Sequence, residues 1–195
     1  MKKRIFFILL VIILICYLFF KKDIRHLYYS YQEYSTINNS IVWSSKNKLQ
    51  LSDFNYEPEK TQMDNVAVTV GIVSVHDISE KITHRSTTVF RPKESFITKK
   101  NDTLVLRIAQ ARFDLCELYR RKMELKISSL NLRETGKTNS DTITKYEELY
   151  YEYFENKWKK FNEIETKDLN KELIKLEKFL KQELKQKTTY NNVYN

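Results

Sequence analysis

The side chains with the most chemical potential in this sequence are His76, His84 and Cys116. Imidazole and thiolate groups are common zinc ligands, so a site that combines the three is one hypothesis. The two histidines fall in neighbouring β-branched stretches and could face each other, but no short-range His, Cys or carboxylate spacing supports a metal site. We favour a structural interpretation, with the histidines as surface or turn-flanking residues and Cys116 as a small core residue.

Nucleophilic catalysis has no local motif in the sequence either. No serine or cysteine stands in a spacing typical of Ser/His/Asp or Cys/His sites. Cys116 lies inside a predicted helix, and thiols in helix interiors are usually inert. The sequence therefore offers no conventional nucleophile.

A predicted hairpin and a long helix position these residues. The stretches 66–76 and 82–90 are rich in β-branched residues and predict two antiparallel strands. Shorter strands are expected at 41–43 and 49–54. Apolar residues at helical spacing predict a helix over 103–130.

Two further helices are predicted after a loop at 131–141. The first covers 142–164 and carries an aromatic stripe, which we interpret as core packing. The stripe consists of Tyr146, Tyr150, Phe154, Trp158 and Phe161. The second covers 168–186 and repeats leucine at helical spacing. We therefore predict an α+β fold, in which a small antiparallel sheet is followed by three helices.

Four segments, in this order, resemble a family of exported bacterial proteins described as zinc-dependent proteases. They are KLQLSDFNYEP (48–58), VAVTVGI (66–72), FRPKESFI (90–97) and LVLRIAQARFDLCELYRRKM (104–123). The family typically shows a Trp/Leu-x-Asp-Phe opening, an Ala-x-Thr-x-Gly-Ile strand, a Phe-x-x-x-x-Ser-Trp-like segment and a His-Glu-Gln-x-His-Phe-Asp-Ile helix. The resemblance covers residues 48–123 and implies a protease-like domain, in which zinc is the family's cofactor.

The zinc-binding positions of that helix are replaced in this sequence. In the family, two histidines at i and i+4 bind one zinc ion, and a glutamate beside the first acts as general base. The corresponding residues here are Ile108, Arg112 and Ala109. Isoleucine has no lone pair, arginine places a fixed positive charge where the dication would sit, and alanine cannot accept a proton. We therefore expect no catalytic residue and no bound cofactor.

The scaffold half of the same helix keeps the family pattern. The matching residues are Gln110, Phe113, Asp114, Glu117, Tyr119 and Arg121. We expect Arg112 to pair with Asp114, with Glu117 or with another carboxylate of the former cleft, and such a cleft could still bind an extended peptide at a sheet edge. A looser match places the family's distal histidine near Lys167 or Asp168, where no histidine stands.

An unbroken apolar run, IFFILLVIILICYLFF, covers residues 5–20. It is slightly shorter than the ~20 residues of a standard membrane span, and basic side chains that can reach lipid headgroups flank both ends. These are Lys2, Lys3, Arg4, Lys21, Lys22 and Arg25. The small residues that cleavage requires are missing after the run, so we predict an uncleaved signal anchor rather than a cleaved signal peptide.

The distribution of charge bears on partners and on orientation. Of the formal net charge of +9, +5 falls in residues 1–25, and the remaining +4 is spread among intermixed Glu and Lys residues. The excess therefore favours anionic lipid headgroups, and we expect no nucleic-acid binding. A slight basic bias before the run favours a cytoplasmic N-terminus, which places residues 26–195 on the periplasmic or extracellular side.

We predict four parts: an anchor at 1–22, a connector at 23–40, a protease-like domain at 41–187 and a disordered tail at 188–195. The tyrosines of the connector suit the headgroup level of a membrane. We expect a single-pass protein of the bacterial cytoplasmic membrane, a pseudopeptidase that binds or scaffolds a protein partner in the cell envelope. Two alternatives stay open, an active metal-dependent peptidase with unconventional ligands and a tether whose two C-terminal helices bind a partner.

Overall fold

The computed structural model describes residues 17, 27, 28, 30–60, 66–77, 83–130 and 137–186. The chain divides into two units, Met1–Thr36 and Ile37–Asn195. The predicted anchor (apart from Tyr17) and the predicted tail at 188–195 lie outside the described residues. Among the residues that the structure describes, no helix is long and apolar enough to cross a membrane.

The region predicted as a connector is partly helical. Residues 27, 28 and 30–38 have helical conformation. The sequence from 27 to 38 contains neither glycine nor proline, so nothing in it interrupts a helix.

Three strands of the second unit form an antiparallel sheet in the order β1-β5-β4. β4 (Val70–Asp77) and β5 (Thr83–Phe90) pair along their full length, with His76 opposite His84. β1 (Ile41–Val42) pairs only with the C-terminal end of β5. The predicted hairpin is therefore confirmed.

A second small sheet, in the order β2-β6-β3, was not predicted. β2 (Asn55–Tyr56) runs parallel to β6 (Phe96–Ile97), and β3 (Val66–Ala67) runs antiparallel to it. The single strand predicted over 66–76 is thus divided into β3 and β4, which belong to different sheets. The division occurs where the Thr69 amide donates a hydrogen bond to Ser95 Oγ at 2.9 Å instead of joining a strand ladder.

The strand predicted over 49–54 is wrong, because the chain forms a 3-10 helix there, η1 (Leu51–Asp53). The Asp53 carboxylate accepts a hydrogen bond from the Gln50 amide at 2.7 Å, which closes a turn that an extended strand cannot make. A second 3-10 helix, η2 (Pro92–Glu94), precedes β6.

Three helices follow the strands, as predicted: α2 (Thr103–Ser129), α3 (Lys137–Asn162) and α4 (Thr166–Gln186). The Asp102 side chain caps α2 by accepting hydrogen bonds from two amides of its first turn, at 3.0 and 3.1 Å. α3 begins five residues before the predicted start at 142, so part of the predicted loop is helical.

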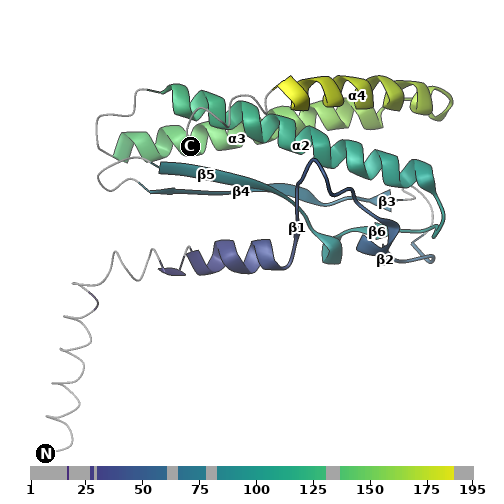
Figure 1. The fold of residues 1–195 in the computed structure, drawn as a ribbon, viewed down its shortest axis with the longest axis horizontal. Helices are drawn as coiled ribbons and strands as arrows, with labels where there is room; N and C mark the ends of the chain where they lie inside the picture. Colours follow the sequence, from purple (N-terminus) through teal and green to yellow (C-terminus); the bar gives the residue numbers. More distant parts are fainter. Residues whose placement is uncertain are drawn as a thin grey trace, which may run out of the picture. The chain divides into compact units, whose positions relative to one another are not determined.

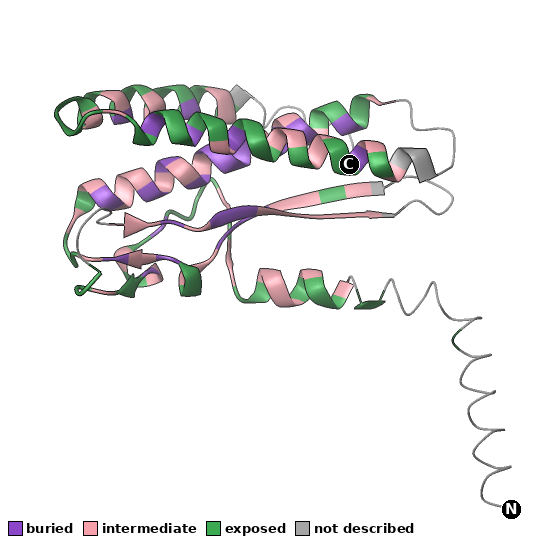
Figure 2. Cartoon of the chain, turned by 180° about the vertical axis from the view of Figure 1, so that it is seen from behind, coloured by how far each residue is buried: buried purple, intermediate pink, exposed green. Residues whose placement is uncertain are grey.

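α2 is the central element of the second unit. It packs against β4 and β5 and also contacts α3 and α4 (Figure 1). Figure 2 shows buried residues gathered on α2 and on the strands it covers. The predicted core stripes are confirmed, since these members are fully or almost fully buried: Phe154, Trp158, Phe161, Leu173 and Leu180. Cys116 is also buried, as expected.

Candidate functional site

Arg112 lies in the middle of α2 and pairs with α3. Its Nη2 atom donates to Glu155 Oε1 at 3.1 Å. The guanidinium carbon lies 5.8 Å from the ring centroid of Phe154 and 5.5 Å from that of Trp158, within the range of cation–π attraction. The partner carboxylate therefore comes from another helix, and Arg112 joins α2 to α3.

Ala109 and Ile108, the other two positions that the resemblance aligns with zinc-site residues, pack in or against the apolar core. Ala109 has an exposed fraction of 0% and belongs to the main core. Ile108 is partly buried and packs against the same core. A general base at position 109 would have no water to activate, because the surroundings are apolar.

Asp114 faces the segment that follows β1. Its Oδ1 atom accepts hydrogen bonds from Trp43 Nε1 at 2.7 Å and from Gln110 Nε2 at 2.8 Å. Lys48 Nζ lies 3.4 Å from Oδ2, and Gln110 Oε1 accepts a hydrogen bond from the Leu49 amide at 2.9 Å. Two residues that match the family pattern thus fasten a loop onto α2.

Glu117 is a buried carboxylate, 4% exposed, between two arginines. Its Oε2 accepts from Arg120 Nε at 2.7 Å and from the Thr88 hydroxyl of β5 at 2.8 Å. Its Oε1 accepts from Arg121 Nε at 2.6 Å, and Arg121 Nη1 donates to the Leu184 carbonyl of α4 at 2.9 Å. Burial raises the pKa of such a carboxyl, but the hydrogen bonds and charges of the arginines outweigh burial and lower the pKa of Glu117.

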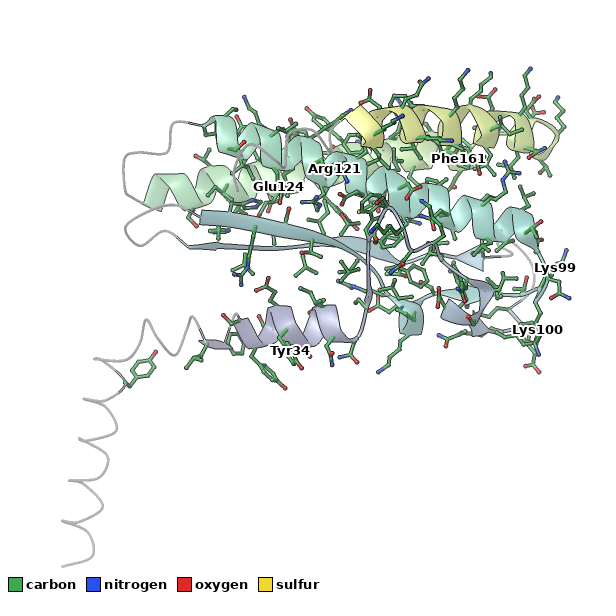
Figure 3. The ribbon with its side chains drawn as sticks, viewed as in Figure 1. Tyr34, Lys99, Lys100, Arg121, Glu124 and Phe161 are labelled. Carbon is green, nitrogen blue, oxygen red and sulfur yellow. The ribbon has the colours of Figure 1, made fainter. Side chains whose placement is uncertain are left out.

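Side chains of α2 close the edge of β5 that β1 leaves uncovered. The backbone hydrogen bonds between β5 and the β1 segment end at Thr88, whose carbonyl accepts a hydrogen bond from the Trp43 amide at 2.9 Å. Strand residues alternate, so the backbone of Ser86 faces the same edge. Its amide donates to Glu124 Oε1 and its carbonyl accepts from Arg120 Nη1, both at 3.1 Å. Arg120 and Glu124 pair at 2.7 Å and replace a neighbouring strand here; Glu124 is labelled in Figure 3.

The three candidate cleft residues do not line one cleft in the described part of the chain. Arg112 contacts α3, Asp114 contacts the segment after β1, and Glu117 contacts β5. At Ser86 the sheet edge is occupied by α2 side chains. An extended peptide would therefore find no open backbone groups at that residue.

A second polar cluster joins α3 to the C-terminal end of β4 and the N-terminal end of β5, on either side of the hairpin turn. This hairpin cluster consists of His76, His84, Ser140 and Glu147. His84 Nε2 donates to Glu147 Oε1 at 3.0 Å, and His76 Nδ1 lies 3.8 Å from the same oxygen. His76 Nε2 lies 3.1 Å from Ser140 Oγ. His84 is the second residue of β5 and so flanks the turn, as one of the two expected placements has it. It is not a surface residue, because its side chain is only 5% exposed.

The hairpin cluster favours the charged forms of His76 and Glu147. The nearby Glu147 carboxylate raises the pKa of His76, although burial opposes this shift. Burial alone would raise the pKa of Glu147, but its interactions with His76, His84 and Ser74 hold that pKa well below its ordinary value. At mildly acidic pH the cluster therefore holds a protonated imidazole against an ionised carboxylate.

The described residues offer no alternative metal centre. Within the described ranges, no group of three or more His, Cys, Asp and Glu side chains could hold a metal ion. Burial raises the pKa of the Cys116 thiol, which disfavours the thiolate that a metal requires. Lys167 and Asp168, the positions of the looser distal match, are exposed in the first turn of α4.

Comparisons of the chain with protein-family models, with curated proteins and with solved structures found no match. The resemblance to zinc-dependent proteases therefore stays a prediction that rests on four sequence segments. An α+β fold is compatible with many activities, so the fold alone does not decide the function.

Sequence reasoning missed two glutamates of α3 that contact the candidate residues. Glu147 and Glu155 each directly follow an aromatic residue of the α3 stripe. Residues beside a buried stripe lie at the border of the helix's apolar face. This spacing could have indicated carboxylates held close to the core.

Replacing Glu117 by glutamine should strongly destabilise the fold, because it leaves Arg120 and Arg121 without their shared carboxylate. We expect a loss of about 3 kcal/mol in the free energy of unfolding. The measurement is denaturant unfolding of the full-length protein in detergent. Glu172→Gln is the matched control, since Glu172 forms a surface pair with Lys175 and its loss should cost less than about 1 kcal/mol. Equal small losses for both variants would contradict the structural role of Glu117.

The hairpin cluster predicts a dependence of stability on pH. The raised pKa of His76 stabilises the fold fully below its ordinary value of 6.5, and this contribution is lost as pH rises through the folded-state pKa. The lowered pKa of Glu147 stabilises the fold above the ordinary value of 4.5. Both contributions are thus complete between these two values.

Unfolding at pH 6 and pH 8.5 measures this effect. Between pH 6 and pH 8.5 the wild type should lose more stability than Glu147→Gln does, because the variant lacks the charged partner of His76. Glu148→Gln is the control, because Glu148 is the exposed neighbour on α3. If Glu147→Gln and Glu148→Gln follow the same pH profile, the cluster does not stabilise the fold in this way.

Proposed function

We propose that the protein is a membrane-anchored, catalytically inactive relative of bacterial zinc-dependent proteases. In this proposal it binds or scaffolds a protein partner on the outer side of the cytoplasmic membrane. The observation that carries the proposal is the Arg112–Glu155 pair at 3.1 Å. It occupies the position where the family has its second zinc-binding histidine, and the charge of Arg112 is neutralised within the fold.

The neighbouring residues of α2 support a role without catalysis. A general base must reach the proton of a water molecule or a substrate. Asp114 accepts hydrogen bonds from Trp43 and Gln110, and Glu117 is enclosed by Thr88 and two arginines. Both carboxylates are thereby committed to holding α2 in place.

The membrane part of the proposal is supported by the sequence. The apolar run at 5–20 carries basic residues on both sides, and no small residue directly follows it, as cleavage would require. The slight excess of positive charge before the run favours a cytoplasmic N-terminus. The second unit would then act outside the cytoplasm, beside partners of the cell envelope.

The tether alternative concerns the outward surface of α4. Leu173 and Leu180 are buried in the main core, so α4 is part of the domain and not a separate arm. Ile174 and Phe179 are exposed by 52% and 41% and are the apolar residues of α4 that a partner could contact.

A second candidate function, a serine hydrolase, has one observation in its favour. Ser140 Oγ, His76 and Glu147 follow the order of nucleophile, base and orienting carboxylate. The 3.8 Å between His76 Nδ1 and Glu147 is too long for a hydrogen bond, and the same oxygen is bound by His84 at 3.0 Å. We therefore favour the structural role of the cluster.

One set of assays on the purified full-length protein tests the proposal. We expect no stoichiometric zinc, no chelator-sensitive peptidase activity and no labelling by a fluorophosphonate probe, because the described residues form neither a metal site nor an activated serine. Stoichiometric zinc with peptidase activity would establish the metallopeptidase alternative. Labelling of the wild type but not of Ser140→Ala would establish the serine hydrolase. Ser128→Ala, an exposed serine of α2, is the matched control.

A further inference from the structure

The helical part of the first unit exposes an apolar stripe. Leu27, Tyr31 and Tyr34 stand at i, i+4 and i+7, so they lie on one face of the helix. They are exposed by 67%, 68% and 66%, and Tyr28 beside them by 57%. Figure 3 labels Tyr34 on this helix. Four large exposed apolar side chains within eight residues form a surface that water does not favour.

The composition of the stripe fits the border between lipid and water. Tyrosine combines an apolar ring with a polar hydroxyl, and it is enriched where membrane proteins cross the headgroup layer. In a helix with 3.6 residues per turn, Glu33 lies about 100° from Tyr34 and about 120° from Leu27, on the side away from Tyr31. The stripe itself contains no acidic residue, so it does not repel anionic headgroups.

The place of the stripe in the sequence brings it close to a membrane. Only residues 21–26 separate the apolar run from Leu27. Six residues span at most about 20 Å even when fully extended. Lys21, Lys22 and Arg25 lie in this short segment, and basic residues next to a span are attracted to anionic lipids.

We propose that Leu27, Tyr28, Tyr31 and Tyr34 dock this helix onto the headgroup layer of the membrane that holds the apolar run. The inference rests on the membrane anchor of the proposed function and adds an interfacial helix to it. The occupant of the stripe is a lipid surface that contains anionic headgroups. The opposite side of the helix, with Glu33 and Thr36, then faces away from the lipid.

Spin labelling of the full-length protein in liposomes of zwitterionic and anionic phospholipids tests the docking. A single cysteine replaces Tyr31 in a Cys16→Ser background, where Cys116 is buried and does not react with the label. The control is the same label at Tyr153, an α3 tyrosine exposed by 47%. We expect the label at position 31 to collide several-fold less with a water-soluble nickel complex, and more with oxygen, than the label at position 153.

Equal collision rates at the two positions would overturn the docking. Strong dipolar broadening at position 31 would also overturn it, because the stripe would then be covered by a second copy of the chain. Carbonate extraction of the same liposomes separates this inference from the anchor on which it rests. Protein that stays in the membrane with a water-exposed label overturns the docking alone, whereas protein that is extracted overturns both.

Discussion

The buried carboxylate of Glu117 holds together most of the second unit. It accepts a hydrogen bond from Thr88 of β5, and its two arginine partners reach the Ser86 carbonyl of β5 and the Leu184 carbonyl of α4. Transferring three charged groups out of water costs several kcal/mol per ion, and only a fully satisfied geometry offsets this cost. The network therefore fixes the rotation of α2 about its own axis.

That rotation determines where the replaced positions of α2 lie. Ala109 is turned into the core, Arg112 is turned towards Glu155 of α3, and Asp114 is turned towards Trp43. In the proposed relation to zinc-dependent proteases, the side chains that match the family pattern hold the helix, whereas the side chains that metal chemistry needs are replaced. The proposed pseudopeptidase requires this separation of roles.

Local patterns were sufficient to predict some elements and not others. The hairpin of β4 and β5 and the helices α2 and α4 followed from runs of β-branched residues and repeats of apolar residues. η1 was missed because the Asp53 carboxylate, not the apolar spacing, decides its turn. The division between β3 and β4 depends on Ser95, which is 26 residues away from its partner Thr69.

The candidate site also contains features that the sequence predicts and features that it does not. The proposed replacement of zinc ligands at Ile108 and Arg112 could be inferred from the i, i+4 spacing of the resemblance. The partner of Arg112 could not, because Glu155 is 43 residues away and on another helix. The hairpin prediction left open that His76 and His84 face each other, and they do. Their partner Glu147 could not be predicted, because it comes from a helix whose register against the hairpin depends on tertiary packing.

The stability of Ala109→Glu tests most directly whether position 109, which the proposal treats as a former catalytic position, is closed to water. Ala109 has an exposed fraction of 0%, while Leu125 of the same helix is exposed by 37% and provides the control Leu125→Glu. A carboxylate forced into the core should lower the free energy of unfolding by about 3 kcal/mol or more, against less than about 1 kcal/mol for the control. Similar small effects of both substitutions would show that position 109 faces water, as it would in an open catalytic cleft.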